Sequence, residues 1–96
     1  MLIRGDLPPG LQLAQVAHVC TEHALKYPVT AASTPIGIVL EVGDEVDLID
    51  RARDGTADGV LFHEEDLGGE ATAYAEVSDG SRFADLPLAG REPAMS

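Results

Sequence analysis

Two adjacent prolines near the start of the chain fix the point at which one backbone conformation must give way to another. Residues Met1–Arg4 form a short apolar run that suits a strand, but Pro8 and Pro9 cannot continue it, because proline has no N–H to offer a sheet. Proline does suit the first turn of a helix, where that N–H would have no partner. We therefore expect a strand before the prolines and a helix from about Pro9, with Asp6 as a capping or pre-cap residue.

The residues after the prolines repeat with the period of a helix. Over about Pro9–Tyr27, apolar side chains recur every three or four positions, which predicts one stripe facing the core. Gln15 and His18 fall on a neighbouring face, and Pro28 ends the helix. The predicted core-facing stripe consists of Leu13, Val16, Ala17, Cys20 and Ala24. As the single cysteine, Cys20 can form no intrachain disulfide, and its place on the stripe indicates a small buried hydrophobe.

The rest of the chain alternates between strand and helix signals. A β-branched run over Ile36–Val42 predicts a buried strand, and Asp44 then suits the N-cap of a second helix. The inward residues of this second helix are predicted to be Val46, Ile49 and Ala52. Two further strands are predicted over Val60–Phe62 and Ala71–Val77. Residues in the last strand alternate with a period of two, which places Thr72 on the face opposite the alanines.

The order of these elements predicts the fold class. Strand, helix, strand, helix, strand, strand indicates an α/β protein, a three-layer α/β/α arrangement with a small mixed four-stranded sheet. We expect one domain over residues 1–90 and a disordered tail over 91–96. A core this thin favours a homodimer. No apolar run reaches the roughly 18 residues of a membrane helix, and the start does not read as a signal peptide, so we expect a cytoplasmic protein.

Two polar segments are candidates for chemistry. Residues 4–10 lead from the first strand into the first helix, and a strand that runs into a helix N-terminus can form an anion site there. Residues 63–72 follow the third strand and supply possible general acids or bases, a glycine pair and Thr72. A proline-stiffened turn and a solvated acidic loop are the alternative interpretations of the two segments. Neither has the spacing of a calcium loop or a zinc site, so we expect no metal and no cofactor.

Together the two segments resemble the type 2 peptidyl-tRNA hydrolase family. In that family a strand ends in Arg-x-Asp-Leu, a turn with glycine follows, and a helix then reads Ala-Gln-x-x-His. The matching residues of this chain are Arg4, Asp6, Leu7, Gly10, Ala14, Gln15 and His18. The family's acidic loop, and the threonine that leads from it into an apolar strand, match at His63–Ala75. The resemblance covers nearly the whole chain in the family's order and implies an esterase that releases the peptide from peptidyl-tRNA.

The resemblance also implies roles for individual residues. Glu64 or Asp66 would act as the base or position the attacking water, and Thr72 would orient the water or the substrate. The start of the first helix would hold the oxyanion. The implied substrate-binding residues are Arg4, Asp6, Gly10, Gln15 and His18. Leu11 stands where the family has a lysine, and losing one electrostatic contact of this kind costs about 10²–10³ in rate.

The charge of the chain works against a nucleic-acid substrate. Acidic residues number 17 and basic residues 6, which gives a net charge of −11. Binding to phosphates requires lysine and arginine, and the six basic residues form no cluster in the sequence. Two alternatives therefore stand beside peptidyl-tRNA hydrolysis. One is a catalytically retired binding module of the same fold whose acidic surface holds a basic protein partner. The other is a hydrolase for a smaller ester or amide.

Overall fold

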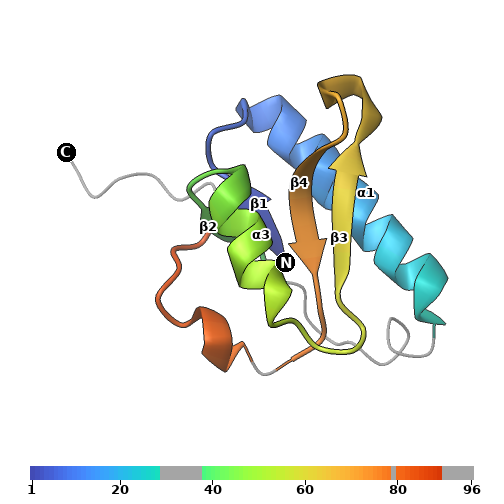
Figure 1. Ribbon diagram of the computed structural model, residues 1–96, viewed down its shortest axis with the longest axis vertical. Coiled ribbons are helices and arrows are strands. Elements are labelled where there is room, and N and C mark those ends of the chain that lie inside the picture. The colour runs from blue at the N-terminus through green and yellow to red at the C-terminus, as the bar shows by residue number, and fades with distance from the viewer. Residues whose placement is uncertain (29–37, 79, 90–96) are drawn as a thin grey trace.

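One mixed sheet of four strands runs through the protein (Figure 1). The computed structural model describes residues 1–28, 38–78 and 80–89. The strands are β1 (Leu2–Arg4), β2 (Leu40–Val42), β3 (Val60–Glu64) and β4 (Glu70–Ala75), in the spatial order β2-β1-β4-β3. β1 pairs with β2 in parallel and with β4 in antiparallel fashion, and β4 pairs antiparallel with β3. The predicted α/β class with a small mixed four-stranded sheet is confirmed.

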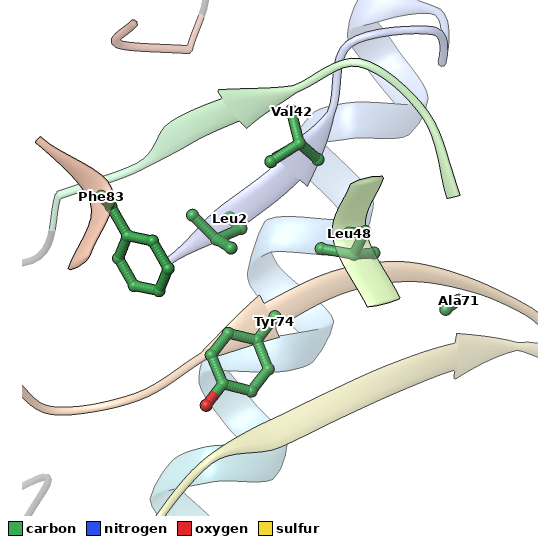
Figure 2. Packing of buried hydrophobic residues seen from close by; sticks show 6 residues of the cluster. All are labelled: Leu2, Val42, Leu48, Ala71, Tyr74 and Phe83. Atoms are coloured by element: carbon green, nitrogen blue, oxygen red, sulfur yellow. The ribbon is translucent and has the colours of Figure 1, made fainter. Parts of the chain in front are cut away.

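Two helices cover opposite faces of this sheet (Figure 1). They are α1 (Pro9–Lys26) and α3 (Glu45–Arg53), and the described residues also form two short 3-10 turns, η1 (Glu65–Leu67) and η2 (Ser81–Phe83). Figure 2 shows the cluster on the α3 face, formed by Leu2, Val42, Leu48, Ala71, Tyr74 and Phe83. The cluster on the α1 face consists of Ile3, Leu7, Val19, Val60, Ala73 and Ala75. Each helix therefore has its own small core against the sheet.

The first helix begins where the prolines predict. Pro9 is the first residue of α1 and Pro8 occupies the N-cap position. The expectation that Asp6 caps this helix is wrong, because its carboxylate instead accepts two hydrogen bonds from Arg4, at 2.8 and 2.9 Å. A guanidinium that meets both oxygens of a carboxylate binds it more strongly than one backbone N–H does. Asp6 therefore ties the turn before α1 to the end of β1.

The predicted core-facing stripe of α1 is also wrong. Four of its five residues are exposed, namely Leu13, Ala17, Cys20 and Ala24, while Val16 is partly buried against the core. Cys20 is therefore not the buried hydrophobe that we expected. The buried residues of the helix are Gln15, Val19 and His23, at intervals of four. Two of these are polar, and they can face inward because Gln15 and His23 both find partners there.

The predicted N-cap of the second helix is confirmed, but the predicted set of inward-facing residues is not. Asp44 is the N-cap of α3, and its side chain accepts a hydrogen bond of 3.0 Å from the backbone N–H of Asp47. Leu48 is the fully buried residue of this helix, whereas Val46 is 68% exposed. Ile49 is also exposed, and of the three predicted inward residues only Ala52 packs against the cluster on the α3 face.

The strands start and end somewhat differently from the predicted ranges. β2 begins at Leu40, and residues 29–37, which include the start of the predicted strand, lie outside the described residues. β3 continues two positions past Phe62, and β4 ends at Ala75 rather than Val77. The predicted tail over 91–96 is also outside the described residues, and the homodimer stays a prediction. In the described part of the chain, no helix has the length and apolarity that crossing a membrane requires.

A pair of substitutions tests the observed orientation of α1. Val19→Asp should lower the free energy of unfolding by several kcal/mol, because it places an unpaired carboxylate in the cluster between α1 and the sheet. Ala17→Asp adds the same charge to the exposed face and should change that free energy by less than about 0.5 kcal/mol. Urea unfolding measures both. Greater destabilisation by Ala17→Asp would mean that α1 is rotated from the position described.

Candidate functional site

Both polar segments singled out in the sequence lie at the same end of the strands that form the sheet (Figure 1). β1 and β2 are parallel and end there together, with Arg4 opposite Val42. β3 ends at the same edge, where Glu64 lies opposite Glu70 at the start of β4. The turn into α1 and the acidic loop around η1 therefore meet at the carboxyl ends of three strands, the place where open α/β sheets bind their ligands.

A β-bulge in β4 determines where Thr72 points. Phe62 of β3 pairs with Ala73, but the next residue, His63, pairs with Ala71, so Thr72 is the extra residue. Ala71 belongs to the cluster on the α3 face, whereas Ala73 belongs to the cluster on the α1 face. The prediction that these alanines share a face opposite Thr72 is therefore wrong. The bulge turns Thr72 towards α1, the same side as Ala73.

Thr72 begins a chain of two hydrogen bonds that leads from the buried interior to a carboxylate. Its hydroxyl donates to Oε1 of Gln15 at 2.7 Å, and Nε2 of Gln15 donates to Oε2 of Glu64 at 3.0 Å. Thr72 and Gln15 are both fully buried. The amide of Gln15 can turn only one way, since its oxygen must face the hydroxyl and its nitrogen the carboxylate. This chain joins three of the residues that the sequence proposed for the site.

His18 lies at the outer end of this chain. Its Nδ1 is 3.4 Å from Oε2 of Glu64, and its ring contacts that of Phe62 with centroids 5.3 Å apart. The side chain of Glu64 is 13% exposed and that of His18 is 52% exposed. Both border an open groove of about 560 Å³ between α1 and the acidic loop. The groove is lined by His18, Thr21, Glu22, Leu25, Phe62, His63, Glu64, Glu65 and Asp66.

The surroundings of Glu64 favour its charged form. The hydrogen bond from Gln15 is the main reason that the pKa of Glu64 lies below its ordinary value, and the backbone N–H of Asp66 and the nearby His18 act in the same direction. Glu64 is therefore ionised at neutral pH. A carboxylate with a lowered pKa is a weak proton acceptor, but it holds and orients a neighbouring imidazole well.

Arg4 and Asp6 take part in structure rather than in an open binding site. The guanidinium of Arg4 is buried and donates to Asp6, to Oε1 of Glu70 at 2.7 Å and to the carbonyl of Ala71 at 3.1 Å. The N–H of Ala71 is bound by Glu45 of α3 at 2.7 Å. The hydrogen bond with Arg4 also lowers the pKa of Asp6. These partners leave Arg4 unable to meet a substrate phosphate without breaking buried bonds.

The start of α1 is too far from His18 to serve the same reaction. Gly10 and His18 are eight positions apart in one helix, about 12 Å along its axis. Gly10 itself is exposed. Leu11 is partly buried against the cluster on the α1 face, which Leu67 of the acidic loop also contacts. The helix start therefore lies about two turns of α1 away from His18.

Of the two candidate acids, Glu64 occupies the centre of the site. Asp66 offers its backbone N–H to Glu64, and its own side chain lies on the exposed rim of the groove. Sequence reasoning gave no specific role to His63, which lines the same groove. Its Nδ1 lies 3.0 Å from the carbonyl oxygen of Gly69, which can only accept, so Nδ1 carries a proton. The position of this histidine directly before Glu64 was the available signal.

Metal-binding geometry and comparisons with known proteins leave the chemistry of the site open. Among the described residues, no group of three or more His, Cys, Asp or Glu side chains is placed to hold a metal ion. No protein-family model, curated protein or solved structure matches the chain.

A double substitution tests the buried chain. Gln15→Leu leaves the Thr72 hydroxyl buried without its acceptor, and we expect it to cost about 1–3 kcal/mol of unfolding free energy. Adding Thr72→Val removes that stranded hydroxyl, so the double variant should be more stable than Gln15→Leu alone. Urea unfolding of the parent and of the two single and one double variants measures the coupling. Additive losses would show that the two side chains do not depend on each other.

The variant Gln15→Leu also leads to a prediction about the pH dependence of stability. The pKa of Glu64 is lowered in the folded protein, so its bond with Gln15 stabilises the fold above the ordinary glutamate pKa and loses effect as the pH falls through the folded value. Gln15→Leu should therefore raise the pKa of Glu64 and destabilise the protein more at neutral pH than in acid. Carbon-13 NMR titration of the Glu64 carboxyl measures the shift, and an unchanged pKa would contradict the assignment.

Proposed function

We propose that the protein is a cytoplasmic peptidyl-tRNA hydrolase-like esterase whose reaction takes place in the groove beside His18. The observation that carries the proposal is the hydrogen-bonded chain from Thr72 through Gln15 to Glu64, which fixes a carboxylate next to an exposed imidazole. Paired carboxylate and histidine side chains of this kind activate nucleophiles in many hydrolases. The resemblance to type 2 peptidyl-tRNA hydrolases supplies the type of bond that would be cleaved.

In this proposal His18 acts as the general base. Glu64 faces Nδ1, so Nε2 is left to take a proton from a water molecule as its oxygen attacks the ester carbonyl. The tetrahedral intermediate then breaks the bond to the ribose oxygen, and the protonated His18 returns the proton to that oxygen. Peptide acid and free tRNA are the products. Glu64 would stabilise the imidazolium that forms between the two steps.

The buried residues take positioning roles. Thr72 was expected to orient the water or the substrate, but a fully buried hydroxyl bonded to Gln15 cannot touch either one. Thr72 and Gln15 would instead hold Glu64 at the correct angle to His18. The oxyanion would be met by His63, the other residue lining the groove that can carry a positive charge. Its Nε2 is free when Nδ1 is bonded to Gly69, and it becomes a donor when the ring is protonated.

The negative charge of the groove indicates that the protein would recognise the ester and the peptide rather than the tRNA phosphates. Each basic side chain of the described residues has a carboxylate partner within 4.0 Å. The groove itself is lined by Glu22, Glu64, Glu65 and Asp66, and it has no lysine or arginine. Contact with tRNA phosphates would thus be weak, because neutralising them requires lysine and arginine. A smaller ester is the substrate variant that fits this charge best.

The acidic rim also favours a second candidate function. A binding module that holds a basic peptide would use the same carboxylates, with Leu25 and Phe62 offering apolar contact for the stems of lysine or arginine side chains. This candidate does not need the chain from Thr72 to Glu64, whereas the esterase does. The two functions can therefore be separated with variants in the groove.

Two neighbouring substitutions, each of which removes one negative charge, distinguish the esterase from the binding module. We expect the parent protein to hydrolyse labelled peptidyl-tRNA, or a p-nitrophenyl ester if the substrate is small, and His18→Asn to reduce kcat by roughly 10²–10⁴-fold. Glu64→Gln should reduce kcat nearly as much, while Glu65→Gln, which removes an exposed charge from the same loop, should leave it within about twofold. Circular dichroism checks that each variant is folded.

Contrary results have definite meanings. Background rates with both esters in the folded parent protein contradict the esterase, and equal losses from Glu64→Gln and Glu65→Gln contradict the role of the buried chain. The binding-module alternative gains support if an arginine-rich peptide then binds and if both substitutions weaken that binding alike. A steep fall of activity on peptidyl-tRNA with added salt, beside a steady rate on the small ester, would identify phosphate contacts.

A further inference from the structure

The two outermost strands of the sheet are treated differently by the rest of the chain. β2 is three residues long, and the segment 87–89 covers its outer side, where the N–H of Ala89 donates to the carbonyl of Val39 at 3.0 Å. β3 is five residues long and pairs only with β4, and among the described residues no segment pairs with its outer side (Figure 1). One side of the sheet is therefore covered in the described part of the chain, and the other is open.

The residues of β3 do little to prevent pairing with another chain. An outermost strand offers a free row of N–H and C=O groups, and many proteins block such a row with lysine, proline or a bulge. β3 reads Val-Leu-Phe-His-Glu over Val60–Glu64, and the bulge beside it lies in β4. Its length of about 17 Å is enough to pair with an extended segment of five or six residues.

A hollow lies against β3 on each face of the sheet. The groove described above is on the α1 face and meets the strand at Phe62. A pocket of about 390 Å³ is on the α3 face, where Ile49 and Ala52 of α3 stand beside Leu61 of β3. Opposite residues of paired strands point to the same face. In an added strand, the residue opposite Phe62 would thus enter the groove, and the one opposite Leu61 would enter the α3-side pocket.

The two hollows favour different side chains. The groove combines apolar surface from Leu25 and Phe62 with the carboxylates of Glu22, Glu64, Glu65 and Asp66. Lysine and arginine match this combination, because their stems are apolar and their ends are cationic. The α3-side pocket contains Arg53, which would repel a second cation, and the side chains of Ile49, Ala52 and Leu61 favour a compact apolar residue.

Charge also distinguishes a foreign segment from a second copy of this chain. The chain has a net charge of −11, so a second copy on β3 would bring its own carboxylates towards those of the groove. We propose that β3 binds an extended segment of another protein by strand addition, with lysine or arginine in the groove at every second position and small apolar residues between them. This site goes beyond hydrolysis, because its main-chain bonds do not require the segment to carry an ester.

A capped hexapeptide of alternating lysine and valine is the probe for strand addition. It should bind saturably in fluorescence anisotropy, and a peptide with three lysines followed by three valines should bind about tenfold more weakly. Alternate N–H groups of a strand point to the same side, so methylating the backbone nitrogens of only the lysines, or only the valines, blocks one side. One methylated isomer should lose at least about tenfold in affinity, and the other should bind like the parent peptide.

Matched variants test the two hollows. Glu65→Lys should weaken binding about tenfold, whereas Asp47→Lys makes the same charge change on an exposed residue of α3 outside the groove and should alter it less than about twofold at 0.15 M salt. Ile49→Asp places a charge in the α3-side pocket and should weaken binding of the peptide. Val46→Asp adds the same charge to an exposed position of the same helix outside that pocket and should not.

Several results would overturn the proposal. Equal affinities of the two methylated isomers would exclude main-chain pairing with β3, and equal binding of the alternating and block peptides would leave net charge as the only cause. A dimer of the protein that the peptide dissociates would identify a second copy as the occupant. Because the peptide has no ester, its failure to bind would refute strand addition without bearing on hydrolysis beside His18, which the ester assays measure separately.

Discussion

The buried guanidinium of Arg4 is the interaction on which the organisation of the groove edge depends. It joins the turn before α1, through Asp6, to the start of β4, through Glu70 and the carbonyl of Ala71. A buried guanidinium that loses a partner is strongly destabilising, so these three contacts must form together. They fix α1 relative to β4 on the side where Gln15 has to reach across to its partners. A residue that the family resemblance assigned to substrate binding thus builds the site instead.

The bulge in β4 follows from the same contacts. An extra residue in a strand disturbs the ladder, and here the N–H and the carbonyl of Ala71 are bound by the side chains of Glu45 and Arg4. Because the N–H and the carbonyl of Ala71 both have hydrogen-bond partners, Thr72 can turn towards α1. Its hydroxyl orients the Gln15 amide, which in turn orients Glu64. Each step uses a buried polar group that has a partner, so the carboxylate at the groove is held in place by the fold itself.

The parts of the fold that sequence reasoning predicted are those set by local chemistry. Pro9 could start a helix and Asp44 could cap one whatever the rest of the chain did, and both are confirmed. The register of α1 depends on distant partners, because Gln15 faces inward only when Thr72 and Glu64 are there to receive it. A polarity pattern counts glutamine as exposed and the alanines opposite it as buried, which reverses the helix. The bulge that aims Thr72 likewise depends on Arg4 and Glu45, and the strand's own sequence carries no sign of it.

The orientation of His18 by Glu64 is the central claim, and the tautomer of His18 tests it most directly. A free neutral imidazole mainly carries its proton on Nε2, whereas a carboxylate beside Nδ1 favours the proton there. Long-range proton–nitrogen NMR correlation spectra, recorded at a pH at which the His18 ring is uncharged, distinguish the two forms. The account predicts that His18 is protonated on Nδ1 and that Glu64→Gln weakens this preference. Protonation mainly on Nε2 in the parent protein would contradict it, because Nε2 could then not accept a proton in the groove.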